Sequence, residues 1–113
     1  MVTPATATVV LVRFPFSNLS AAKLRPAVVL ADAGRGDWVL CQITSNAYAD
    51  RVAVRLDDAD FARGSRQRVS YARPGKLFTA NEELMAGEVG RLTPDKHREV
   101  VAAVVALLEV RAP

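Results

Sequence analysis

Two groups of polar side chains stand beside apolar runs of strand length, and their residue types are those that bind phosphate. Arg25 precedes the valine-rich run 26–31, and the polar run 44–46 (Thr-Ser-Asn) follows a second apolar run, 38–43. A guanidinium donates hydrogen bonds in a bidentate fork that matches phosphate oxygens, and hydroxyl and amide groups can complete such a site. The fold must bring the two groups together for this chemistry.

The segment between the two runs predicts a β-hairpin. Residues 32–37 are rich in turn formers and hold two glycines able to adopt positive φ. A turn centred on Gly34 and Arg35 places Ala31 opposite Trp38.

Counting outward from this turn places Arg25 opposite Thr44 at the open end of the hairpin. Directly opposed residues of an antiparallel pair have Cβ atoms about 4.5 to 5.5 Å apart. We therefore expect one small polar site that holds Arg25 and Thr44 together with Ser45 and Asn46, with Lys23 just outside it.

The remaining pattern predicts more short strands and a final helix. Alternating apolar residues at Val52, Val54 and Leu56 indicate a half-buried strand with these side chains inward. Strands are expected over residues 8–14, 51–56, 67–73, 76–79 and 89–92, the last at a sheet edge, with a loop at 17–24 and a loop or single helical turn at 57–65.

Two helix starts are readable. Asn81 is a good N-cap for a short helix through Met85, and Thr93 with Pro94 behind it begins the clearest helix. The apolar face of this helix consists of Val100, Val101, Val104, Val105 and Leu108.

Length and composition set the class of protein. At 113 residues and 50% hydrophobic, the chain is expected to form one domain, residues 1–113. The start lacks the basic region of a signal peptide and no stretch reaches the about 18 apolar residues of a membrane span, which predicts a cytoplasmic protein. Arginine supplies 12 of the 15 basic residues. Either binding to an acidic partner or coding bias explains this excess of arginine.

The supply of metal ligands is small. One histidine, His97, and one cysteine, Cys41, without a paired ligand motif, predict neither a metal site nor a cofactor. Cys41 lies within an apolar run, so its side chain is expected to be buried in the core. A single unpaired cysteine fits a protein of a reducing compartment. His97 is expected to be a packing or surface residue of the final helix.

The segments VVLVRFPFSNLSAAKLRPAVVL (residues 9–30) and VLCQITSN (residues 39–46) resemble the PemK/MazF-type toxins of bacterial toxin-antitoxin pairs. Weaker similarity continues through residues 70–79 and 89–92. The resemblance implies a mainly β fold with a C-terminal helix, a small SH3-like barrel.

The resemblance also implies an activity. It predicts a sequence-specific endoribonuclease that cleaves single-stranded RNA or mRNA without a metal, through attack of the RNA's own 2′-hydroxyl, and so inhibits translation and growth. Arg25 and Thr44 match the family's catalytic positions. Because a guanidinium has a pKa above about 12, we favour charge stabilisation by Arg25 over a proton-transfer role.

Further residues are expected to contact RNA. Phe16 stacks on a base or packs in the core, and Arg68 contacts the RNA backbone or belongs, with Arg63 and Arg66, to a solvated basic face. The expected RNA-binding set is Phe16, Lys23, Ser45, Asn46, Arg68, Arg73 and Lys76.

The chain departs from the family pattern at two places. Ala7 and Thr8 stand where relatives have Gly-Asp, and Gly75 stands where some relatives carry an acidic residue, so a general base cannot be carried over from that position.

The expected partners are a second copy in a homodimer and an acidic or partly disordered antitoxin. The alternatives are a non-catalytic SH3-like module that binds RNA or protein, a gyrase-poison-like fold relative, and a degenerate toxin that retains only antitoxin binding.

Overall fold

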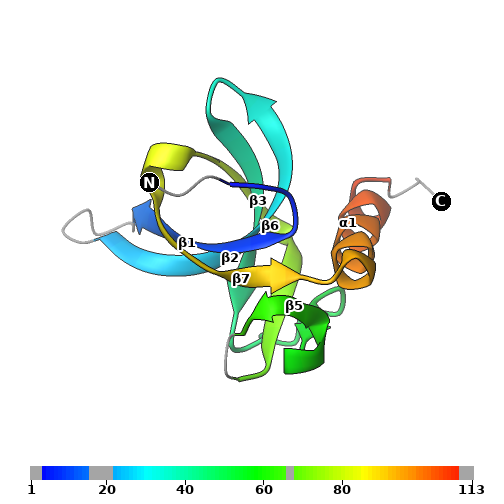
Figure 1. Cartoon of the computed structure of the whole chain (residues 1–113). Coiled ribbons are helices and arrows are strands. Elements are labelled where there is room, and N and C mark those ends of the chain that lie inside the picture. Colours follow the sequence, from blue (N-terminus) through cyan, green and yellow to red (C-terminus); the bar gives the residue numbers. More distant parts are fainter. Residues whose placement is uncertain (1–3, 16–21, 66–67, 110–113) are drawn as a thin grey trace.

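The computed structural model describes residues 4–15, 22–65 and 68–109. The elements are β1 (Thr8–Pro15), β2 (Ala22–Gly34), β3 (Asp37–Thr44), β4 (Val54–Leu56), the 3₁₀ helix η1 (Asp58–Asp60), β5 (Phe61–Gly64), β6 (Ser70–Asn81), the 3₁₀ helix η2 (Glu82–Leu84), β7 (Met85–Leu92) and α1 (Pro94–Leu108). The strands form one antiparallel sheet in the order β4-β6-β3-β2-β1-β7-β5. Helix α1 follows the last strand of the chain, β7 (Figure 1).

The two edge strands of the sheet, β4 and β5, follow each other in the sequence with only η1 between them. The link is tight: Asp60 Oδ2 accepts a hydrogen bond from the backbone N–H of Asp57 (2.7 Å), and the Asp57 carbonyl accepts one from the N–H of Asp60 (2.9 Å). The sheet therefore curls until a short link joins its outer strands.

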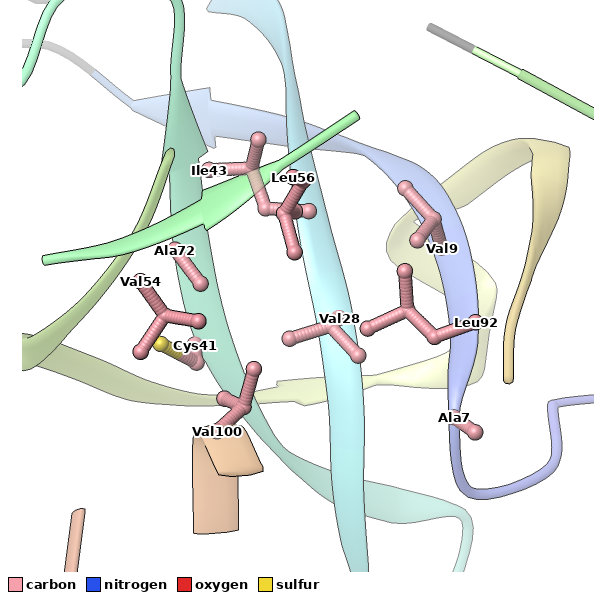
Figure 2. Packing of buried hydrophobic residues seen from close by; sticks show 10 residues of the cluster. All are labelled: Ala7, Val9, Val28, Cys41, Ile43, Val54, Leu56, Ala72, Leu92 and Val100. Carbon is pink, nitrogen blue, oxygen red and sulfur yellow. The ribbon is translucent and has the colours of Figure 1, made fainter. Parts of the chain in front are cut away.

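The curled sheet buries side chains on both faces. Along β2, Val28 belongs to one cluster while Ala27 and Val29 belong to the other, as the alternation of a pleated strand requires. The first cluster, shown in Figure 2, contains Ala7, Val9, Val28, Cys41, Ile43, Val54, Leu56, Ala72, Leu92 and, from α1, Val100. The second contains Val10, Val12, Ala27, Val29, Leu40, Ala80 and Met85. The predicted class, mainly β with a C-terminal helix and a small curled barrel, is confirmed.

β1 lies inside the sheet and pairs on both sides. It meets β2, its neighbour in sequence, and β7, which follows more than half the chain later; Val9 pairs with Val28 and with Gly90. The strand predicted at residues 8–14 is confirmed.

The hairpin of β2 and β3 has the predicted register toward its open end but not at its turn. Trp38 pairs with Asp32 instead of Ala31, because the register shifts by one residue at a bulge in β2. The turn lies at Arg35 and Gly36, both with positive φ (58° and 80°), one position later than predicted.

Two strand starts differ from the prediction. β2 begins at Ala22, so residues 22–24, expected in a loop, pair with the end of β1. β4 begins only at Val54, and Val52 is 43% exposed instead of turned inward. The cause is local: the side chain of Asp50 accepts a hydrogen bond from the N–H of Val52 (3.1 Å), which closes a turn in competition with strand pairing.

The C-terminal half of the sheet also differs. β5 lies in the segment expected to be a loop or turn, and it takes the edge position predicted for residues 89–92 because it pairs with β7. Asn81 caps a short helix as predicted, accepting from the N–H of Glu83 (3.0 Å), but that helix is a single 3₁₀ turn and Met85 already begins β7.

Helix α1 begins as predicted, since Thr93 Oγ1 accepts a hydrogen bond from the N–H of Lys96 (3.2 Å) and Pro94 stands at the first turn. The helix packs mainly on β6 and β4. Of its apolar face, Val100 and Val104 are buried, whereas Val105 and Leu108 are exposed. The curled sheet therefore covers only part of the apolar face that the sequence predicts for α1. No helix in the described part of the chain combines the length and apolar character needed to cross a membrane.

Candidate active site

Arg25 occupies a partly buried position on β2, where it pairs with Val12 of β1. Its Nε atom is fully buried. On the same face of β2 the next residues toward the turn are Ala27 and Val29 of the second cluster. The guanidinium therefore extends from an apolar, rigid base, where a charge acts through a lower effective dielectric than in water.

Thr44 is the last residue of β3 and pairs with Tyr71 of β6. Its Oγ1 accepts a hydrogen bond from the backbone N–H of Asn46 (3.2 Å). A hydroxyl has one proton to donate and two lone pairs, so this bond occupies an acceptor site and leaves the proton for another oxygen. Ser45 and Asn46 follow on an exposed loop.

Arg25 and Thr44 stand at corresponding places on adjacent strands. The last pair of the β2–β3 ladder toward this end joins Ala27 and Gln42, and each candidate residue lies two positions beyond it. Because side chains alternate along a strand, both project from the face that carries the second cluster. The structure thus places a cationic fork and a hydroxyl at the same end and the same face of the hairpin.

A second polar cluster lies in the loop after Thr44. Arg73 of β6 binds Asp50 through Nε and Oδ2 (2.9 Å), with the two side chains 22% and 13% exposed. The Arg73 guanidinium also lies over the ring of Tyr48, 5.8 Å from its centroid. This cluster ties residues 45–53 to β6.

β6 supplies Arg73 through a bulge. Between the pairs Cys41–Leu77 and Ile43–Ala72, β3 has one residue while β6 has four, residues 73–76. The bulge also presents Lys76, which is exposed.

Asp50 makes stability depend on pH. Its bond from Arg73, and then that from the N–H of Val52, lower the pKa of Asp50 below its ordinary value. In the unfolded chain Asp50 takes up a proton near pH 3.9, so the stabilisation is complete above that pH and is lost as pH falls through the lower folded pKa.

We expect the free energy of unfolding of Asp50→Asn to be about 1–2 kcal/mol lower than that of wild type at pH 7. The difference between the two proteins should narrow below about pH 4. Urea unfolding at neutral and acid pH measures this, and a gap that stays constant would contradict it.

The other predicted RNA-binding residues are distributed unevenly. Lys23 is exposed on β2, two residues before Arg25. Arg68 lines a surface cavity with Asp57, Asp58, Ala59 and Val69, so it lies beside the acidic η1 link. Phe16 lies outside the described residues.

Gly75 is exposed in the β6 bulge. A Cβ built on it would lie 3.7 Å from Cδ2 of Leu107, an ordinary van der Waals contact, so a side chain at this position would begin beside α1. Cys41 is buried as predicted; burial raises the pKa of its thiol to about 12, and the thiol donates to the carbonyl of Arg73 (3.1 Å). The thiol therefore stays protonated at neutral pH.

His97 is partly buried on α1, with a buried Nδ1. Burial, and then the charge of Arg91, lower its pKa, so the imidazole is neutral at pH 7. Among residues 4–15, 22–65 and 68–109, no group of three or more His, Cys, Asp or Glu side chains is placed to hold a metal ion.

Comparison with known families decides what kind of protein carries this site. The sequence pattern of the PemK-like, MazF-like toxin of type II toxin-antitoxin system matches residues 6–108. The chain belongs to this toxin family. No curated protein gave a significant sequence match.

Solved structures similar to this toxin share its fold. A MazE-MazF structure from Deinococcus radiodurans has a TM-score of 0.75 at 18% identity, covering 96% of this chain and 98% of that chain. An endoribonuclease in complex with its cognate antitoxin from a Mycobacterial species has a TM-score of 0.73 at 14% identity, with both chains covered completely. The Mycobacterium tuberculosis toxin MazF-mt6 has a TM-score of 0.70 at 14% identity, covering 93% and 99%.

Tyr48 and Asp50 were not predicted individually as site residues, although the family resemblance implies that the loop of residues 47–50 helps to read RNA bases. The available signal was the spacing of Asn46 and Asp50, since both side chains accept hydrogen bonds from backbone N–H groups two residues later, Tyr48 (2.8 Å) and Val52 (3.1 Å). Such residues mark a fixed loop conformation, but not what the loop holds.

Proposed function

We propose that this toxin is a sequence-specific endoribonuclease that cleaves single-stranded RNA, including mRNA, and that Arg25 and Thr44 contact the scissile phosphate. The observation that carries the proposal is the position of these two residues, each two places beyond the Ala27–Gln42 pair on one face of the hairpin. A guanidinium with a buried Nε is suited to stabilise the negative charge that builds on phosphate oxygens during cleavage.

The proposed reaction uses a nucleophile that the RNA itself supplies. The 2′-oxygen loses its proton and forms a bond to phosphorus while the bond from phosphorus to the 5′-oxygen breaks and that oxygen takes a proton. The products are a 2′,3′-cyclic phosphate and a 5′-hydroxyl. Arg25 stabilises the pentacoordinate state, and the Thr44 hydroxyl donates to a non-bridging oxygen or orients the 2′-hydroxyl.

We further propose that the toxin acts as a homodimer in the cytoplasm, that residues 1–113 form one domain, and that a cognate antitoxin binds it. Support comes from the similar structures, which include an endoribonuclease with its cognate antitoxin and a MazE-MazF structure. The net charge of +3 suits an acidic antitoxin segment as well as RNA.

The test is cleavage of a long single-stranded RNA in EDTA, followed by mapping of the cut positions and analysis of both ends. We expect discrete cuts with cyclic-phosphate and 5′-hydroxyl ends. A synthetic substrate with a single 2′-deoxynucleotide at a mapped position should resist cutting there. Thr44→Val, which keeps the shape and removes the hydroxyl, should slow cutting, whereas circular dichroism should show an unchanged fold. Cleavage at the deoxy position, or no cleavage by wild type, would refute the proposal.

A further inference from the structure

Tyr48 combines an exposed aromatic side chain with a strained backbone conformation. Its side chain is a large aromatic ring, yet the residue is 68% exposed. Its backbone has φ of 52° and that of Ala49 has φ of 59°, so two consecutive residues other than glycine adopt the left-handed conformation. Residues held in sparsely populated backbone regions cluster at active sites and ligand-binding segments, because such strain costs folding free energy.

The strain is held by specific contacts. Asn46 Oδ1 accepts from the N–H of Tyr48 (2.8 Å), and the carbonyl of Ala47 accepts from the N–H of Asp50 (2.9 Å). Asp50 in turn fixes Arg73, whose guanidinium lies over the Tyr48 ring at a distance typical of a cation–π contact. The ring is therefore held in place while most of its surface remains open to solvent.

The backbone of Tyr48 also lies close to Thr44 of the candidate active site. A chain of two hydrogen bonds leads from Thr44 Oγ1 through Asn46 to the N–H of Tyr48. Four residues span at most about 14 Å of backbone, so the ring is within reach of a nucleotide that adjoins the phosphate at Thr44.

We propose that Tyr48 is a stacking platform for one base of the single-stranded RNA, and that Arg73 is a positioning residue that supports this platform. The inference rests on the proposed function, since it names a base-binding position of that same site. Unstacked bases of single-stranded RNA bind aromatic rings through their faces. Arg73, bound to Asp50 and covered by the ring, is committed to holding Tyr48.

The test measures binding separately from cleavage. The probe is a short fluorescein-labelled single-stranded RNA of mixed sequence with 2′-O-methyl groups, which blocks the attacking hydroxyl, and binding is followed by fluorescence anisotropy at one fixed salt concentration. We expect Tyr48→Ala and Tyr48→Leu to bind about 5- to 100-fold more weakly than wild type. Tyr48→Phe should restore most of this affinity, because it keeps the ring. Val52→Ala, at an exposed apolar residue of the same loop, is the matched control.

The outcomes separate this inference from the proposed function. If Tyr48→Ala binds the probe like wild type and the Val52→Ala control, or if wild type does not bind it at all, the platform is refuted. Cleavage of unmodified RNA by wild type then still decides the nuclease proposal on its own. If binding depends on the ring but wild type cuts no RNA, the platform stands and the nuclease proposal fails.

Discussion

The Arg25→Ala variant is expected to cleave RNA with a kcat about 10²- to 10³-fold below that of wild type, the usual cost of removing one preorganised group that stabilises a developing oxyanion. The physical reason is the partly buried position of Arg25 beside apolar neighbours, where its charge is screened less than at an open surface. KM should change less, because the other contacts to RNA remain. Single-turnover cleavage of a mapped substrate separates the two quantities.

Two further variants make the Arg25 experiment specific. Arg35→Ala removes an exposed arginine from the turn at the other end of the same hairpin and should cleave at the wild-type rate. Arg25→Lys retains a charge but loses the bidentate fork, so we expect an intermediate rate. Thermal melts of all variants check that the fold is kept. A kcat for Arg25→Ala within tenfold of wild type would remove Arg25 from the proposed mechanism.

The second large effect is expected at Gly90, where β7 is enclosed by strands on both sides. Gly90 pairs with Val9 of β1 and with Gly64 of β5. A Cβ at this position would lie 2.4 Å from the carbonyl oxygen of Arg63, so the backbone of β5 would have to move. We expect Gly90→Ala to lose about 2–3 kcal/mol of unfolding free energy, which lowers Tm by roughly 10 °C.

Gly87 on the same strand provides the control, since a Cβ there would have no neighbour within 4 Å. Gly87→Ala should be neutral or slightly stabilising, because alanine restricts the unfolded chain more than glycine does. Calorimetry or urea unfolding of the two variants gives the comparison. Equal stabilities for Gly90→Ala and Gly87→Ala would show that β5 does not approach β7 as closely as described.

The sequence predicted local structure best where several signals agreed. Thr93 and Pro94 set the start of α1, and the turn-rich segment 32–37 between two apolar runs set the register that reaches Ala27 and Gln42. The turn itself was off by one position, because a bulge in β2 and a positive φ at Arg35 leave no mark in the pattern. Side-chain periodicity records which face is buried, but not an extra residue.

Long-range features of the candidate site could not be predicted in the same way. The contact of Arg73 with Tyr48 and Asp50 depends on the four-residue bulge of β6, which brings two distant segments together. Val52 shows the opposite failure, since its alternating neighbours predicted a strand that the hydrogen bond to Asp50 prevents. In both cases a tertiary or side-chain interaction overrides local preference.

The pairing of β1 with β7 has a consequence for how the toxin is made. Residues 8–12 lie against residues 85–91, so the barrel cannot close until nearly all of the chain has left the ribosome. The hairpin that carries Arg25 and Thr44 depends on contacts near in sequence and can form early, whereas β1 keeps one unpaired edge until β7 arrives. Sheets with such distant partners fold slowly, on the scale of about milliseconds to seconds. A nascent copy can therefore form the hairpin with Arg25 and Thr44 before the rest of the sheet has closed around it.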